Sequence, residues 1–244
     1  MAVVSGPVAF DVDGESYSVA FTVNALCALE EEFGGRSISD IGDNIASGSA
    51  GARGVRALFR ASLLDAHPQI SDRDAGRLLD ALGAQAAGDI IQQAFARVQA
   101  GLQDIAGELP PVDKQGRLIF EVAGERIMLV FGFNAQAELE DYFGGLKPEE
   151  IARKVGAREI TLRDLRAMFR ASAIDDRELT IAAAGRLIDR IGLKVAGRAV
   201  AVAFVGAFPE AATEMEGEPE GNRRQRRAAA ARPTKRPKGG TGKR

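Results

Sequence analysis

The chain has 244 residues, of which 45% are hydrophobic and 27% charged, and its formal net charge is −2. This length suggests one or two domains, each large enough to bury its own core. One cysteine excludes an intrachain disulfide, and the longest apolar run is far shorter than the ~20 residues of a membrane span. The first residues lack the basic and apolar regions of a signal peptide, so we expect a soluble, cytoplasmic protein.

The small net charge hides a strong asymmetry along the chain. Residues 222–244 hold ten of the 32 Lys and Arg residues and none of the 34 acids. The rest of the chain therefore carries 22 bases against 34 acids, a net charge of −12. An acidic body precedes a strongly basic C-terminal segment.

The chain contains a tandem duplication. Residues 23–35 return as residues 133–145, displaced by 110 positions. Other matching pairs are 10–15 with 120–125, 56–62 with 166–172, and, at a displacement of 109, 75–80 with 184–189. The pattern predicts two similar domains, which we call the first unit (1–106) and the second unit (118–209), joined by a linker (107–117) and followed by a tail (210–244).

Each unit is expected to open with a β-hairpin. Apolar residues alternate with others in 8–12 and again in 17–21, on either side of Asp13-Gly14. An Asp-Gly pair between two such segments is a strong hairpin signal, because the turn needs positive φ. The second unit repeats the pattern around Ala123-Gly124.

A helix should follow each hairpin, with Asn24 and Asn134 as the N-caps. The glycine pairs 34–35 and 144–145 should end these helices in left-handed conformations. Further helices are predicted over 39–46, 53–64, 71–83 and 86–100 in the first unit, and over 148–155, 161–174, 180–192 and 195–208 in the second. Pro148 suits the first position of its helix, and Thr161 begins a capping box.

The fold class is therefore α+β and mostly helical, with two similar units that each contain a β-hairpin and four or five helices. From residue 210 the composition changes to Glu, Gly and Pro, and then to Arg, Lys, Ala and Pro. Such a segment cannot bury enough apolar surface to offset its ordering entropy, so we expect a disordered tail, acidic at first and then basic.

No residue pattern indicates catalysis. His67 lies in a loop with no His or Cys near it in sequence, which favours a surface histidine. Cys27 lies inside a helix where the second unit has Ala137, which favours a small buried residue over a nucleophile. The Gly/Ser-rich segment 47–51 lacks the Gly-Lys-Ser/Thr ending of a phosphate-binding loop. We expect a protein that is not an enzyme, with no cofactor and no metal.

Charged residues follow a repeated pattern on two helices. Arg53, Arg56 and Arg60 share one helix face, and Arg163, Arg166 and Arg170 repeat it. Acidic residues cluster on the helix that follows each hairpin, at 30–32 and at 138, 140 and 141. These stripes either pair within each unit or face solvent, or they form a docking surface for another protein.

The basic tail is a second candidate binding segment. Arg223, Arg224, Arg226 and Arg227 lead it, and residues 235–238 add further positive charge. Such a segment could contact phosphates, but without aromatic residues its binding to nucleic acid would be non-specific. It could equally bind an acidic protein surface, including its own acidic body, or remain solvated.

The Asn-Ala-x-x-x-Leu-Glu pattern of residues 24–30, the Gly-Gly pair after it, and the Arg-containing segment 56–62 resemble a known family. It is that of the tail assembly chaperones of gene transfer agents and related tailed phages, some described as tail tube proteins. The resemblance covers about 8–100 and again 118–208, whereas family members usually have one unit. It implies a non-enzymatic phage-type (prophage) chaperone that binds tape-measure or tail tube protein during tail morphogenesis in the host cytoplasm.

Two other functions stay open at this point. The chain could be a structural tail component, such as a tube protein, and then be found in the particle. It could instead be a nucleic-acid-associated protein that acts through its basic tail. A helical, acidic body favours the chaperone, because a tube ring would ordinarily be built mainly from strands.

Overall fold

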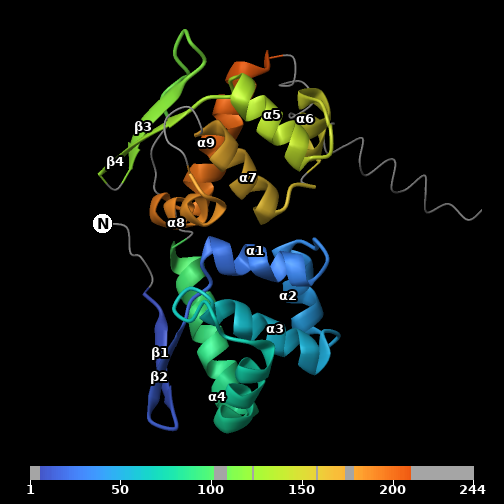
Figure 1. Ribbon diagram of the computed structural model, residues 1–244, viewed down its shortest axis with the longest axis vertical. Coiled ribbons are helices and arrows are strands. Elements are labelled where there is room, and N and C mark those ends of the chain that lie inside the picture. The colour runs from blue at the N-terminus through green and yellow to red at the C-terminus, as the bar shows by residue number, and fades with distance from the viewer. Residues whose placement is uncertain (1–5, 102–108, 123, 158, 174–178, 210–244) are drawn as a thin grey trace, which may run out of the picture.

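The computed structural model describes residues 6–101, 109–122, 124–157, 159–173 and 179–209. As the sequence predicts, these residues are mostly helical and include two small antiparallel hairpins (Figure 1). The helices of the first unit are α1 (Val23–Glu32), α2 (Ile38–Ala46), α3 (Gly51–Leu63) and α4 (Asp72–Gly101). Those of the second are α5 (Phe133–Tyr142), α6 (Pro148–Gly156), α7 (Leu162–Ser172), α8 (Ile181–Ile191) and α9 (Leu193–Ala207). No helix in the described part of the chain is long and apolar enough to cross a membrane.

The first hairpin pairs β1 (Val8–Val12) with β2 (Glu15–Val19). Its turn residues Asp13 and Gly14 have φ of 52° and 82°, the two positive values that a tight two-residue turn requires. The second hairpin pairs β3 (Leu118–Val122) with β4 (Glu125–Leu129) in the same register. The predicted hairpins are confirmed, although β2 begins two residues earlier than the alternation suggested.

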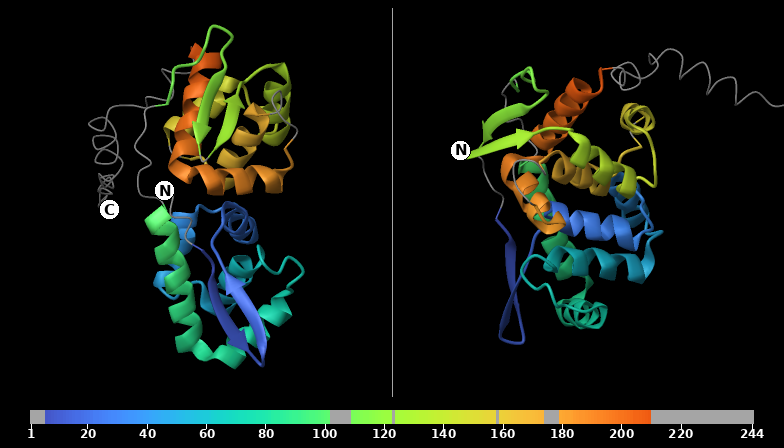
Figure 2. Two further views of the ribbon diagram at one scale, coloured as in Figure 1. Left: turned by 90° about the vertical axis from the view of Figure 1, so that its left-hand side faces the viewer. Right: turned by 45° about the horizontal axis from the view of Figure 1, so that its top comes forward.

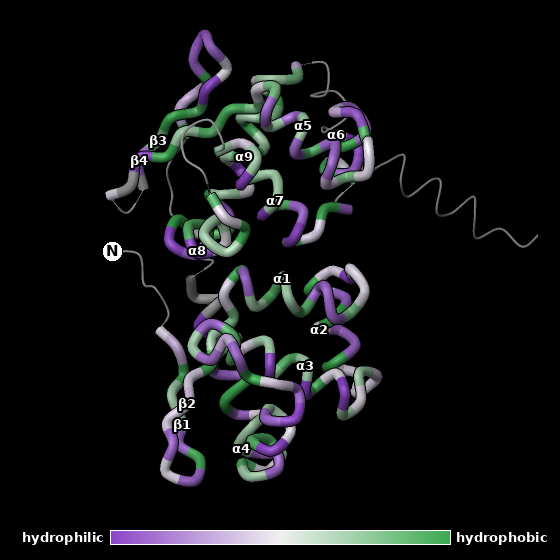
Figure 3. Tube along the Cα trace, in the orientation of Figure 1, coloured by the Kyte–Doolittle hydropathy of each residue, from purple (hydrophilic) through white to green (hydrophobic). Residues whose placement is uncertain are grey.

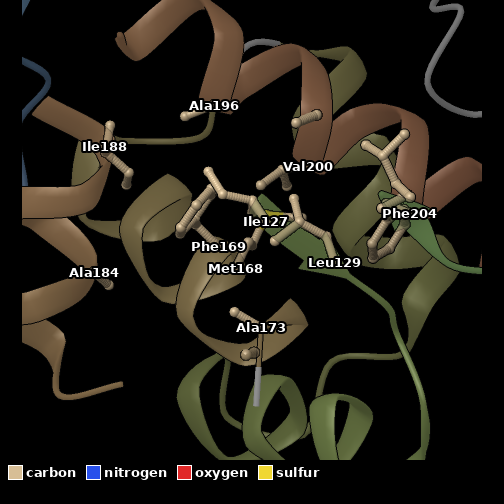
Figure 4. Packing of buried hydrophobic residues seen from close by; sticks show 14 of the residues in the cluster. Ile127, Leu129, Met168, Phe169, Ala173, Ala184, Ile188, Ala196, Val200 and Phe204 are labelled. Atoms are coloured by element: carbon tan, nitrogen blue, oxygen red, sulfur yellow. The ribbon is translucent and has the colours of Figure 1, made fainter. Parts of the chain in front are cut away.

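The buried side chains form two clusters, one mainly from each half of the chain, and Val23 and Cys27 of the first unit belong to the second cluster. In the first unit Val19, Leu29, Phe59 and Leu63 are almost inaccessible to solvent. In the second unit the cluster draws on β4, α7 and α9, whose side chains converge in Figure 4. The same hydrophobic spacing along the two halves of the sequence therefore supports two cores, one behind each hairpin.

A repeated hydrogen bond ties each hairpin to the helix behind it. The amide of Ala20 donates to the carbonyl of Ser62 at 2.8 Å, and that of Val130 donates to the carbonyl of Ser172 at 2.7 Å. In both units the serine hydroxyl also bonds to the carbonyl three residues earlier in its own helix. The serine that ends segments 56–62 and 166–172 therefore has the same structural role in both units.

The predicted N-caps Asn24 and Asn134 are wrong. Helix α1 begins at Val23, and Thr22 caps it by accepting a hydrogen bond from the Ala25 amide. Helix α5 has Gly132 at the corresponding position and no side-chain cap bond there. Both asparagines lie inside the first helical turn, and the Asn24 side chain bonds to α7 and α8 instead of capping α1.

Other predicted helix ends are confirmed. Gly34 and Gly35 have positive φ directly after α1, Pro148 opens α6, and Thr161 forms a capping box with Asp164 at the start of α7. The fourth and fifth predicted helices of the first unit form one element, α4, but Gly83 interrupts it with φ 74° and ψ 159°.

The two units follow one another along the longest axis of the molecule (Figure 1). Helix α1 of the first unit faces α7 and α8 of the second, and both hairpins lie on the same side, as the turned view in Figure 2 also shows. Hydrophobic and hydrophilic residues alternate along α3 and α7 in Figure 3, as expected for helices packed on one face. The second unit thus repeats the orientation of the first instead of mirroring it.

Candidate functional site

The most specific polar contacts between distant parts of the chain join α1 to α7 and α8. We call this region the inter-unit contact. On α1 it comprises Val23, Asn24, Cys27 and Glu30. On the second unit it comprises Leu162, Arg163, Arg166, Ala182, Gly185 and Asp189.

Glu30 caps the first turn of α7. Its two carboxylate oxygens accept the amides of Leu162 and Arg163 at 3.0 and 2.8 Å. These amides have no partner within their own helix, and a carboxylate there also interacts favourably with the helix dipole. Glu30 is only 1% exposed, and this burial raises the pKa of its carboxyl group, while the two amide bonds oppose that rise.

Asn24 inserts its carboxamide between α7 and α8. Its Nδ2 donates to the carbonyl of Ala182 at 2.9 Å, and its Oδ1 accepts from Arg166 at 2.8 Å. Gly185 makes room for it, because a Cβ atom at that position would overlap the carboxamide. Arg166 is held closely enough that its Nε is buried without a hydrogen-bond partner.

Asp189 completes the polar part of the contact at the start of α1. Its Oδ1 accepts the first amide of the helix, that of Val23, at 2.8 Å. One side of Asp189 stays open to solvent, yet the packing around its carboxyl group raises the pKa to about 6. Desolvation is the main cause, the Val23 amide opposes it, and the nearby charge of Asp65 adds to it.

Two side chains of α1 join the core of the second unit. Val23 is 4% exposed and Cys27 is 1% exposed, and both pack into the cluster built from residues of β3 to α9. Burial raises the pKa of the Cys27 thiol to about 12, which suppresses the reactive thiolate. The sequence interpretation of Cys27 as a small buried residue agrees with this position.

The structure divides the six predicted arginines among different roles. Arg163 and Arg166 lie in the inter-unit contact. Arg60 and Arg170 each donate from Nε to the carbonyl just before the next helix, that of Ile70 or Leu179, at 3.1 Å in both units.

The other arginines make surface ion pairs. Arg56 lies 3.4 Å from Asp72, and Arg170 also pairs with Glu138 at 2.8 Å. Arg53 pairs with Glu32 at 3.1 Å, although its side chain remains 80% exposed. The tail residues Arg223, Arg224, Arg226 and Arg227 lie outside the described residues.

The other sequence candidates occupy the first unit. His67 is half-buried, and its ring lies 5.1 Å from that of Tyr17. The serines of segment 47–51 bond to each other, Ser47 Oγ to Ser49 Oγ at 2.8 Å. Within the described residues, no group of three or more His, Cys, Asp and Glu side chains could hold a metal ion.

A small apolar pocket lies between α5, α6 and the end of α9. Its volume of about 10 Å³ is comparable to one water molecule. The lining residues include Leu139, Ile151 and Phe204.

Comparison of the chain with protein-family models, with curated proteins and with solved structures gave no match.

Sequence reasoning missed the inter-unit contact. Glu30 belongs to a run of three acids on a helix, a pattern typical of a solvent-exposed face, and Gly185 lies in a repeated segment that predicts only a helix. Two features of the sequence could have indicated it. Gly185 is a glycine inside a helical pattern, and Asn24 follows Thr22, which is already a suitable N-cap.

Proposed function

We propose that this chain is a non-enzymatic tail assembly chaperone of the phage or gene transfer agent type. Its clients are the tape-measure or tail tube protein, which it binds in the host cytoplasm before the tail is complete. Client proteins of this kind expose helical or apolar surfaces that would aggregate if left uncovered.

The observation that carries the proposal is the repetition of one unit in one orientation along the molecule (Figures 1 and 2). Both units keep the Asn-Ala helix, its Gly-Gly end and the Arg-containing helix packed behind it. Two similar surfaces at a fixed spacing suit a long, repetitive client, because the second binding event then occurs at a high effective concentration.

The chemistry of the described residues supports a binding role. Three polar groups with strongly altered environments, Glu30, Asp189 and Cys27, are used in contacts between helices of the chain itself. The acidic body would repel nucleic acid, so binding to tail proteins suits it better than binding to phosphates.

The test combines two measurements in cells that produce particles. The full chain, carrying an affinity handle, is used as bait at low and high salt with nuclease added, and purified particles are analysed by mass spectrometry. The proposal expects tape-measure or tube protein with the bait and no copy of the chain in particles. An abundant copy in particles would instead identify a structural tail component. Recovery of nucleic acid alone, lost at high salt, would indicate action through the basic tail.

A further inference from the structure

The duplication places a second set of the inter-unit contact residues on the two outer faces of the molecule. We propose that copies of this chain bind one another head to tail, with α5 of one copy seated on α3 and α4 of the next. This contact between copies would have the same geometry as the contact of α1 with α7 and α8 within one chain. This inference does not depend on the proposed function.

The α5 face repeats the residues by which α1 makes the contact. Phe133 corresponds to Val23, Asn134 to Asn24 and Glu140 to Glu30, all at the displacement of 110. Their environments differ sharply. Val23 is 4% exposed, whereas Phe133 is 89% exposed, the highest value among the large exposed hydrophobic side chains of the described residues. Asn134 and Glu140 are exposed as well.

The α3–α4 face repeats the residues that receive α1. Gly76 corresponds to Gly185 and Asp80 to Asp189 at the displacement of 109, and Arg56 corresponds to Arg166 at 110. Asp80 is exposed, and Arg56 makes only a long surface ion pair of 3.4 Å with Asp72.

Gly76 is the most informative of these residues. A Cβ atom there would meet the side chain of Arg56 at 3.6 Å, an ordinary contact, so nothing within the chain requires glycine. Glycine inside a helix is unfavourable compared with alanine. At Gly185 the same absence of a side chain admits the Asn24 carboxamide. An incoming Asn134 would use the space at Gly76 in the same way.

The helix ends on these faces also fit the proposal. Thr161 caps α7 with its side chain, and Glu30 adds two further acceptors. The N-cap residue of α3, Ala50, makes no side-chain cap bond, and Gly51, which corresponds to Thr161 at the displacement of 110, has no side chain to make one. A carboxylate from Glu140 of another copy would satisfy amides at the start of α3 as Glu30 does at α7.

The symmetry of the contact explains why it leaves two open faces. The face of α1 binds the different face formed by α7 and α8, so the contact is heterologous. Figure 2 shows α5 and the α3–α4 face on opposite sides of the inter-unit contact. Adding copies by the same relation therefore extends a row, which closes only if the rotation between units allows it.

The test measures the mass of the full chain by analytical ultracentrifugation from about 1 μM to about 1 mM, a range that covers transient complexes. We expect a mass that rises with concentration above the 25.8 kDa of one chain. Gly76→Gln fills the receiving face, and Phe133→Asp places a carboxylate opposite Asp80. Each variant alone should lose self-association by at least about tenfold in Kd. Gly88→Gln is the control: Gly88 lies in α4 beyond the interruption at Gly83, and a Cβ atom there would have nothing within 4 Å. This variant should associate like the wild type.

Mixing the two defective variants gives the sharpest result. The Gly76→Gln chain keeps an intact α5 face and the Phe133→Asp chain an intact α3–α4 face, so the mixture should form a one-to-one dimer and nothing larger. Phe133 is exposed and Gly76 is partly exposed, and an unchanged circular dichroism spectrum would verify that each variant folds.

Three outcomes would overturn the proposal. One is a wild-type chain that stays at 25.8 kDa throughout the range. Another is association that Gly76→Gln and Gly88→Gln affect equally. The third is association that disappears in about 0.5 M salt in every variant alike, which would assign it to attraction between the basic segment and the acidic body.

Discussion

Replacing Glu30 by alanine tests the inter-unit contact directly. The substitution removes a carboxylate that accepts two amides at the start of α7, at 3.0 and 2.8 Å. Hydrogen bonds to a charged group contribute about 1.5–3 kcal/mol each, and the desolvation that raises the pKa of Glu30 offsets part of this. We expect the free energy of unfolding to fall by about 3 kcal/mol, or about 6–12 °C in Tm for a chain of this size.

The control is Glu140→Ala, the same change at the corresponding position of the second unit. Glu140 is exposed, so at a concentration where the chain is monomeric its loss should cost less than about 0.5 kcal/mol. Glu30→Gln keeps one acceptor, so its free energy of unfolding should lie between those of Glu30→Ala and Glu140→Ala. Urea unfolding followed by circular dichroism measures all three. Equal unfolding free energies for Glu30→Ala and Glu140→Ala would refute the capping role of Glu30.

Three further predictions use the same region. Gly185→Ala should destabilise the chain by about 1–3 kcal/mol, because the new methyl group overlaps the carboxamide of Asn24. Gly76→Ala should be neutral or stabilise the chain by up to about 1 kcal/mol in the same urea titration. The pKa of Asp189 in the folded state is about 6, above its ordinary 3.8, so the folded protein binds the proton more tightly than the unfolded chain. The free energy of unfolding should therefore fall as pH rises from about 4 to about 6. Asp189→Asn should reduce that slope, measured by urea unfolding at each pH, and an unchanged slope would contradict the prediction. Because burial raises the pKa of Cys27 to about 12, its thiolate fraction at pH 8 is about a thousandfold below that of a free thiol. Labelling by a thiol reagent should therefore be slow in buffer and fast in urea. Rapid labelling of the folded chain would contradict this burial.

The sequence predicts those features that depend on neighbouring residues. Asp13-Gly14 predicts its turn because few residues adopt positive φ, and the Gly34-Gly35 pair ends α1 for the same reason. Thr161 and Asp164 form their capping box because both partners lie within one turn of helix. Duplication adds support, since the turn glycine and the Gly-Gly pair each occur again in the second unit.

Contacts between distant helices could not be predicted in this way. Thr22 and Asn24 are both acceptable N-caps, and the choice between them depends on whether the asparagine has a better partner, which α8 provides. Glu30 belongs to a run of acids that would ordinarily face water. Only the orphan amides of α7, 132 residues further along the chain, make its burial favourable.

The heterologous contact also bears on why two units share one chain. A single unit of this kind carries the α1-type face and the α7–α8-type face on different sides, so two such units cannot satisfy both faces in a symmetric dimer. Linking two units makes the first contact intramolecular, where the effective concentration is of the order of millimolar even if the contact itself is weak. The outer faces have no such tether, so contacts between chains should be weaker and should respond to protein concentration. If the proposed chaperone function holds, a client with many repeats would bring chains together and strengthen these contacts by the same effect.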